Sequence, residues 1–159
     1  MTTTDTAVLK HITVKAPVER AFRVFTEGVD TWWPRDHHIG SAPMKRVIIE
    51  QRAGGRCYTE QVDGTACDWG QVLAWEPPAR FVMAWQVSPA WKFEPDLAKS
   101  SEVEVRFTAQ ADGSTRVDLA HRYFERHGAG VEGMRAAIDS PGGWSGMLAS
   151  FAAQCESGV

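Results

Sequence analysis

The segment DTWWPRDHHIG, residues 30–40, gathers residue types suited to binding a metal ion or a ligand. The imidazoles of its adjacent histidines, His37 and His38, diverge, and the sequence has no H-x-H, H-x-x-x-H or C-x-x-C pattern that could complete a zinc site. We therefore expect this segment to form the rim of a pocket and to bind no structural metal. One of Trp32 and Trp33 should fill the core while the other faces the pocket, and the sequence does not say which. Trp33 and His38 are taken as candidate ligand contacts.

His121 is the second candidate, because it lies in a segment that alternates like a strand. Val117, Leu119 and Tyr123 share its face, while charged residues occupy the other face. A lone histidine on an apolar face is commonly a hydrogen-bonded core residue, yet this face would also border any cavity beneath a covering helix. We expect the imidazole to project into that cavity as the main polar contact of a ligand, or as the acid–base group of an enzyme. On this hypothesis, His121→Ala weakens ligand binding with little change in the fold.

Other catalytic arrangements find little support in the sequence. Cys67 has no histidine that can be placed beside it, and a free buried cysteine usually acts as a small apolar residue. There is no glycine-rich phosphate loop, no nucleophile elbow and no carboxylate pair at a recognisable spacing. We assign no catalytic residue except His121 under the enzyme hypothesis, and we expect no cofactor.

The elements that must position these side chains follow from hydrophobic periodicity. Residues 7–16 alternate between apolar and polar types and predict a first strand. Residues 18–27 carry apolar residues at helical spacing after Pro17, which suits a helix start, and a second short helical turn precedes Pro34. Alternation and tight-turn signals then predict about six antiparallel strands, at residues 44–52, 55–62, 65–76, 80–87, 100–110 and 115–125.

The last predicted element is an amphipathic helix, which Ser140 can cap and in which Pro141 suits the first position. Its apolar stripe comprises Trp144, Met147, Leu148, Phe151, Ala152 and Cys155. Hairpin-connected strands followed by one helix predict an α+β fold. In it, a curved antiparallel sheet of about six to seven strands wraps a long C-terminal helix. A ligand cavity is expected between sheet and helix.

Strand alternation and the helix stripe predict which side chains line that cavity. They are Trp69, Trp75 or both, with Phe81, Met83, Trp85, Val105, Phe107, Leu119, His121, Trp144, Met147, Leu148 and Phe151. With Leu73 and Trp75 facing inward, Trp69 and Gln71 face inward too, unless a bulge intervenes at Gly70. The loop at residues 88–99 exposes Trp91 and Phe93, which a lid over the pocket or a dimer contact would explain.

Composition narrows the class of partner. Seven tryptophans, six of them between Trp32 and Trp91, are many for 159 residues and indicate an aromatic core or an aromatic cavity. Seventeen basic against twenty acidic residues, without a basic stripe, argue against nucleic acid. No apolar run could span a membrane, no signal-peptide pattern opens the sequence, and three widely spaced cysteines argue against a disulfide framework. We expect one cytoplasmic domain over residues 1–159, with its core at residues 8–155.

The order of elements resembles the START-like, or SRPBCC, superfamily with its helix-grip fold, and more narrowly the family of the activator of the heat-shock protein 90 ATPase. The similarity covers about residues 8–155. It rests on the segments APVERAFRVFTE, WWP, AGGRCY, DWGQVLAWEPPARFVMAWQ, EVEVRFTAQADGSTRVDLAHRYFE and GGW. It implies a domain that holds hydrophobic small molecules between sheet and helix. Members of the superfamily act as polyketide cyclases or aromatases, as lipid or hormone carriers, or as self-resistance proteins.

Three functional hypotheses follow. The first is binding of a hydrophobic or aromatic small molecule, favoured by the tryptophans on the lining strands. The second is a polyketide cyclase/dehydratase-like or hydrolase-like enzyme that uses His121, although we lean toward a protein that is not an enzyme. The third is a stress-related co-chaperone, ranked last because the eponymous protein carries a separate N-terminal domain for which this chain has no room. A homodimer stays open.

Overall fold

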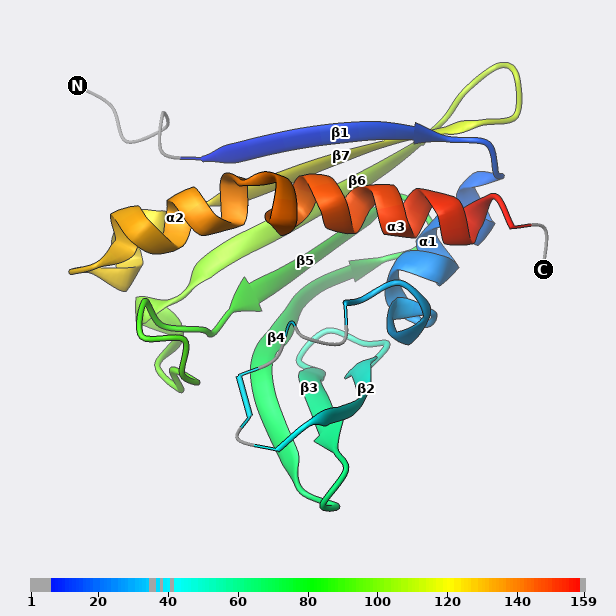
Figure 1. The fold of residues 1–159 in the computed structure, drawn as a ribbon. Coiled ribbons are helices and arrows are strands. Elements are labelled where there is room, and N and C mark those ends of the chain that lie inside the picture. Colours follow the sequence, from blue (N-terminus) through cyan, green and yellow to red (C-terminus); the bar gives the residue numbers. More distant parts are fainter. Residues whose placement is uncertain (1–6, 35–36, 38, 41, 158–159) are drawn as a thin grey trace, which may run out of the picture.

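The computed structural model describes residues 7–34, 37, 39–40 and 42–157, which fold around one curved antiparallel sheet (Figure 1). The sheet has seven strands in the order β1-β7-β6-β5-β4-β3-β2. Their bounds are β1 Val8–Val14, β2 Met44–Ile49, β3 Arg56–Gln61, β4 Ala66–Glu76, β5 Arg80–Trp85, β6 Ser101–Ala109 and β7 Thr115–Arg122. The predicted α+β class and the number of strands are confirmed.

A layer of helices covers one face of the sheet. The layer contains α1 Val18–Thr26, α2 Val131–Asp139 and α3 Gly146–Cys155. Short helical turns lie at Val29–Thr31, Leu97–Lys99 and Phe124–His127. Figure 1 shows α2 and α3 running one after the other across β1, β7 and β6, with α1 beside the far end of α3. None of the described helices is long and apolar enough to cross a membrane.

The two faces of β6 and β7 differ as the alternation predicts. Val105 and Leu119 are buried beneath the helices. On the opposite face, Glu104 accepts hydrogen bonds from Arg80 at 2.6 Å and from Arg122 at 3.1 Å. The register of these central strands is therefore the predicted one, with the charged face away from the helix layer.

Aromatic rings fill the space between α1, α3 and the middle of the sheet. The ring of Phe25 lies 4.9 Å from that of Trp32, 5.8 Å from that of Phe107 and 5.2 Å from that of Phe151, as measured between centroids. The indole N–H of Trp32 donates to the backbone oxygen of Val24 at 2.9 Å. Trp32 is thus the core member of the tryptophan pair, which the sequence left undecided.

A β-bulge in β4 places Trp69 in the helix-facing layer. Against β3, Gly70 pairs with Cys57 while Asp68 pairs with Tyr58, so Trp69 is the extra residue. An extra residue bends the strand and re-aims its side chains. Trp69 is buried, with only 4% of its surface exposed.

A second bulge in β4 reverses the expected orientation of Leu73. Against β5, Val72 pairs with Met83 while Ala74 pairs with Val82, so Leu73 is unpaired. Val72 is fully buried and Leu73 is 38% exposed. The prediction that Leu73 faces inward is wrong, because the extra residue shifts the alternation of the strand by one position.

The C-terminal helix layer is broken, which the sequence did not predict. Only α3 corresponds to the predicted helix, and α2 precedes it across an irregular turn at Pro141–Ser145. Gly143 has φ −89° and ψ −133°, outside the helical region. Ser140 makes no side-chain cap and instead donates its hydroxyl to the backbone oxygen of Ala137 at 2.6 Å. The break coincides with Pro141, which has no backbone N–H to continue α2 and which follows Ser140 in an extended conformation at φ −73° and ψ 167°.

Gly143→Ala is expected to lower the free energy of unfolding by about 1–3 kcal/mol, because a new methyl group must displace packed backbone. A Cβ at this position would lie 2.0 Å from the backbone oxygen of Ile138. Gly133→Ala is the matched control, since a Cβ there meets no atom within 4 Å inside α2. It should stabilise the protein by roughly 0.5–1 kcal/mol. Urea unfolding of both variants is the measurement, and equal effects would contradict a sterically required break.

β7 ends at Arg122, three residues before the end of the predicted strand at residues 115–125. Tyr123, expected on the inward face, adopts φ +68° and is 39% exposed. Its ring faces the guanidinium group of Arg126, whose central carbon lies 4.3 Å from the ring centroid. This prediction is wrong because the chain leaves the sheet after Arg122 to begin the short turn at Phe124–His127.

Candidate functional site

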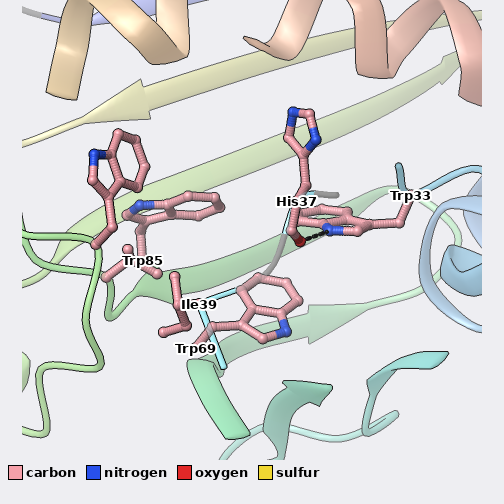
Figure 2. Close-up of a pocket in the computed structure, with 7 residues that line it drawn as sticks. Trp33, His37, Ile39, Trp69 and Trp85 are labelled. Carbon is pink, nitrogen blue, oxygen red and sulfur yellow. Dashed lines mark hydrogen bonds between the residues drawn. The ribbon is translucent and has the colours of Figure 1, made fainter. Parts of the chain in front are cut away.

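A pocket of about 280 Å³ lies between strands β4 and β5, the loop that follows β5, and the predicted rim segment, which contributes Trp33, His37 and Ile39. Its lining consists of Trp33, His37, Ile39, Trp69, Trp85, Val87 and Trp91 (Figure 2). Four of these seven residues are tryptophans, so the walls are mostly flat and apolar. The volume lies near the lower end of the roughly 300–1,000 Å³ that small-molecule sites occupy.

The tryptophans of the pocket brace one another. The rings of Trp33 and Trp69 are stacked, with centroids 5.0 Å apart and planes at 27°. Trp85 meets Trp69 edge-on at 5.8 Å. The indole N–H of Trp33 donates to the backbone oxygen of His37 at 2.8 Å, which ties the wall to the rim segment (Figure 2). The walls are therefore held in place without a ligand.

The rim segment reaches the helix layer through His37. Figure 2 shows its ring projecting from the loop toward the helices, and its Nε2 lies 3.0 Å from the backbone oxygen of Gly142. The carbonyl can only accept, so Nε2 carries the proton. The structure brings Trp33, His37 and Ile39 to the pocket, in the segment for which a rim was expected. His38 lies outside the described residues.

A second hollow, of about 260 Å³, adjoins the first beneath the break between α2 and α3. It shares His37, Trp85 and Trp91 with the first pocket. Its remaining lining comes from the helix layer: Ala137, Ile138, Ser140, Gly142, Gly143, Trp144 and Met147. The two hollows together form the candidate site.

Several residues expected to line the cavity lie elsewhere. Met83, Phe107, Leu148 and Phe151 are buried in the core and line neither hollow. Trp75 packs edge-on against Phe22, with centroids 5.1 Å apart, at the α1 end of the sheet. The physical reason is that the rings around Phe25 fill the middle of the sheet, and Trp75 instead lines a separate hollow of about 440 Å³ at the α1 end, together with Phe22 and Pro77.

His121 does not line either hollow. It has no exposed surface, its ring stacks on Phe124 at 4.4 Å, and Trp85 lies edge-on to it at 5.2 Å. The indole N–H of Trp144 donates to its Nδ1 at 3.1 Å, and its Nε2 lies 2.7 Å from Ser101 Oγ. The ring therefore does not project directly into the cavity as the sequence predicted, because the protein itself bonds both ring nitrogens behind the pocket wall.

These bonds continue to His127 in a chain whose proton directions are determined. An indole N–H only donates, so His121 Nδ1 is bare, and Nε2 of the neutral ring donates to Ser101 Oγ. His127 Nε2 accepts from the backbone N–H of Ser101 at 3.2 Å and lies 2.8 Å from Ser101 Oγ, so it accepts the hydroxyl proton as well. Burial lowers the pKa of His121 well below 6.5, and burial also lowers the pKa of His127 despite nearby Glu94. Both rings are therefore neutral at pH 7.

Two indole N–H groups in the pocket walls are buried without a partner. Among the described residues, neither Trp69 Nε1 nor Trp85 Nε1 has a hydrogen-bond acceptor. Leaving a buried donor unsatisfied costs roughly 1–3 kcal/mol. The walls therefore contain two indole donors without a partner among the described residues.

Metal and nucleophile chemistry gain no support from the described residues. Within these residues, no group of three or more His, Cys, Asp or Glu side chains is placed to hold a metal ion. Burial raises the pKa of the Cys67 thiol, which therefore stays protonated at neutral pH. The titratable side chain that both hollows share, within the described part of the chain, is His37.

Sequence reasoning named Ile39 only as part of the rim segment, and it missed Val87 and the helix-break glycines as lining residues. No periodic signal marks them, because they lie in a loop, just beyond the end of β5 and in an irregular turn. Trp91 carried a signal, as an aromatic residue in a polar, proline-rich loop. It is 45% exposed, adopts φ +62°, and lines both hollows.

Comparisons with known proteins agree with this architecture. The family described as Activator of Hsp90 ATPase homolog 1-like protein matches residues 15–156. No curated protein matches the chain. Among solved structures, anthrahydroquino-gamma-pyrone synthase Txn09, in complex with SUM, is 38% identical with a TM-score of 0.66. The match covers 96% of this chain and 98% of Txn09.

Two further structures share the fold. The self-sacrificing resistance protein CalC from Micromonospora echinospora is 29% identical with a TM-score of 0.65, and the match covers 95% of this chain and 94% of CalC. Protein NE0264 from Nitrosomonas europaea is 14% identical with a TM-score of 0.63, covering 95% of this chain and 94% of that protein. The second of these likenesses concerns the fold alone. The chain is similar over nearly its whole described length to domains of the helix-grip type.

Proposed function

We propose that this chain, which belongs to the family described as Activator of Hsp90 ATPase homolog 1-like protein, binds a planar aromatic small molecule between the tryptophans of its pocket. The observation that carries the proposal is the pocket wall itself, in which Trp33, Trp69, Trp85 and Trp91 surround one open volume. Flat indole faces favour ring-shaped ligands through offset and edge-on contacts.

The comparisons support the same class of ligand. The name of Txn09, which is 38% identical to this chain, describes a fused aromatic product. The unpartnered indole donors of Trp69 and Trp85 favour a ligand that carries carbonyl or phenolic oxygens over a pure hydrocarbon. A hydroxylated polycyclic quinone combines both properties.

Alizarin, a hydroxylated three-ring quinone, tests this proposal. Its titration into the purified protein should quench tryptophan fluorescence with saturation at one ligand per chain, because the ring enters the aromatic pocket. Calorimetry gives the stoichiometry independently, and native mass spectrometry of the freshly purified protein would reveal a ligand that co-purifies. Quenching that never saturates and equals that of free tryptophan would contradict the proposal.

Trp91→Ala is expected to weaken alizarin binding by about tenfold, because one aromatic wall of the site is lost. The melting temperature should change little, since the ring is 45% exposed. Phe93→Ala is the matched control: it lies on the same loop and is 40% exposed, but it lines neither hollow. If both variants bind alizarin equally, Trp91 is not part of the site.

A second candidate function is catalysis on such a ligand, favoured by the identity of 38% with a synthase. The acid–base role considered for His121 would require release of the bonds to Trp144 and Ser101. Liquid chromatography of alizarin and related polycyclic quinones after incubation with the protein tests for turnover. Recovery of unchanged ligand in every case would leave binding as the function.

A further inference from the structure

His37 stands at the boundary between the two hollows. Both are lined by its ring, together with Trp85 and Trp91. The His37 ring projects from the loop toward the helices (Figure 2). A ligand that extended from one hollow into the other would have to pass this side chain.

A hydrogen bond links the His37 ring to the helix layer. Nε2 donates to the backbone oxygen of Gly142, at 3.0 Å, within the break between α2 and α3. This carbonyl belongs to the irregular turn, where regular helical bonding is interrupted at Gly143. The break thus supplies an acceptor for the ring at the place where the two hollows meet.

The volumes of the two hollows limit the length of ligand that each can hold. At about 280 Å³, the first hollow is near the lower end of the range for small-molecule sites, and the second adds about 260 Å³ under the helix break. A short aromatic ligand would fit the first hollow with the ring in place, whereas an elongated polycyclic ligand that occupied both hollows would displace it.

We propose that His37 determines the length of the ligand that the site accepts, through the bond that fastens its ring to Gly142. The inference rests on the proposed function and adds to it a specificity-determining residue. An elongated ligand must first break this bond, so its apparent affinity is reduced by the fraction of protein in which the ring is displaced. A short ligand binds without displacing it.

The experiment compares a two-ring probe, 1,5-dihydroxynaphthalene, with a four-ring probe, doxorubicinone. His37→Ala should bind doxorubicinone about tenfold more tightly than the unmodified protein does, which corresponds to the net worth of roughly one hydrogen bond. Its Kd for 1,5-dihydroxynaphthalene should stay within about twofold. Both constants come from fluorescence titration and calorimetry, and circular dichroism verifies that the variant is folded.

Two control variants identify the cause of any change. His37→Gln places an amide donor at nearly the same reach, so it should retain the bond to Gly142 and the selectivity of the unmodified protein. Ile39→Ala removes a residue that lines the first hollow alone, so it should weaken both probes to a similar degree.

The outcomes separate the two proposals. If 1,5-dihydroxynaphthalene, alizarin and doxorubicinone all fail to bind the unmodified protein and its variants, the proposed function is wrong and this inference falls with it. If the probes bind but His37→Ala changes both constants equally, His37 is an ordinary wall residue and the inference alone is overturned. If His37→Gln behaves like His37→Ala, the bond to Gly142 does not set the selectivity.

Discussion

Replacing His121 with alanine is expected to lower the free energy of unfolding by about 3–5 kcal/mol, the range found when a large buried side chain is truncated. His121 is fully buried, and its ring stacks on Phe124. The substitution also removes the acceptor of the Trp144 indole and a partner of Ser101, so both polar groups lose a bond inside the core. A network that loses its central member loses more than one pairwise contact.

Thermal and urea unfolding measure this effect. The melting temperature should fall by roughly 10 °C, at about 2–4 °C per kcal/mol for a domain of this size. His11→Ala, an exposed histidine of β1, is the control and should change stability by less than about 0.5 kcal/mol. If His121→Ala has the same melting temperature as the unmodified protein but has lost affinity for alizarin, this prediction is wrong, and His121 contacts the ligand as the sequence predicted.

Acidification is expected to destabilise the protein before its carboxylates titrate. The pKa values of His121 and His127 are lowered by burial, so the unfolded chain binds protons that the folded chain excludes. Stability from these groups is fully present above pH 6.5, the pKa of a histidine in the unfolded chain. It is lost as the pH falls below 6.5 toward the lower pKa values of the folded chain. The slope is at most about 1.4 kcal/mol per pH unit for each histidine. The stability that Glu104 contributes through its lowered pKa is present above pH 4.5 and is lost only as the pH falls below that value.

The hydrogen bonds explain why neither ring accepts a proton readily. A proton on His121 Nδ1 would face the indole N–H of Trp144, and a proton on His127 Nε2 would face the backbone N–H of Ser101. In each case, protonation would place two hydrogen-bond donors against each other in a buried site, with no acceptor between them. The expected fall in stability has a structural cause in addition to desolvation.

Urea unfolding at several pH values between about 7 and 5 measures the slope. His127→Gln is the informative variant, because an amide oxygen can accept from Ser101 and carries no charge at any pH. It should remove the contribution of His127 to the slope of unfolding free energy against pH and leave the contribution of His121 in place. A stability that stays constant across this range would show that the two histidines titrate normally in the folded chain.

Much of the fold could be predicted from the sequence because it depends on local periodicity. The alternation of Val103, Val105 and Phe107 and the stripe from Trp144 to Cys155 each predict a buried face, and the structure buries both. Such patterns depend on the period of a strand or helix and need no knowledge of neighbours. Elements that break the period, such as the bulge at Leu73 and the turn around Gly143, could not be predicted in this way.

The candidate site was only partly within reach of the sequence. The excess of tryptophan indicated an aromatic lining, and the loop residue Trp91 carried a separate signal. The partition of Trp32 to the core and Trp33 to the pocket could not be inferred, because adjacent residues differ only in what packs around them. His37 was named with its neighbour His38, yet its placement opposite Gly142 joins residues 105 positions apart.

The sequence by itself determined the class of the fold, the order of its elements, and the aromatic character of whatever lines its open volume. It could do so because burial of apolar side chains follows the repeat of the backbone. Only the tertiary structure decided where that volume lies and which residues face it. His121 shows the reason: its strand face was predicted correctly, but whether an inward ring meets a ligand or a serine and an indole depends on side chains from β6 and the helix layer. Distant packing, which no local pattern encodes, makes that choice.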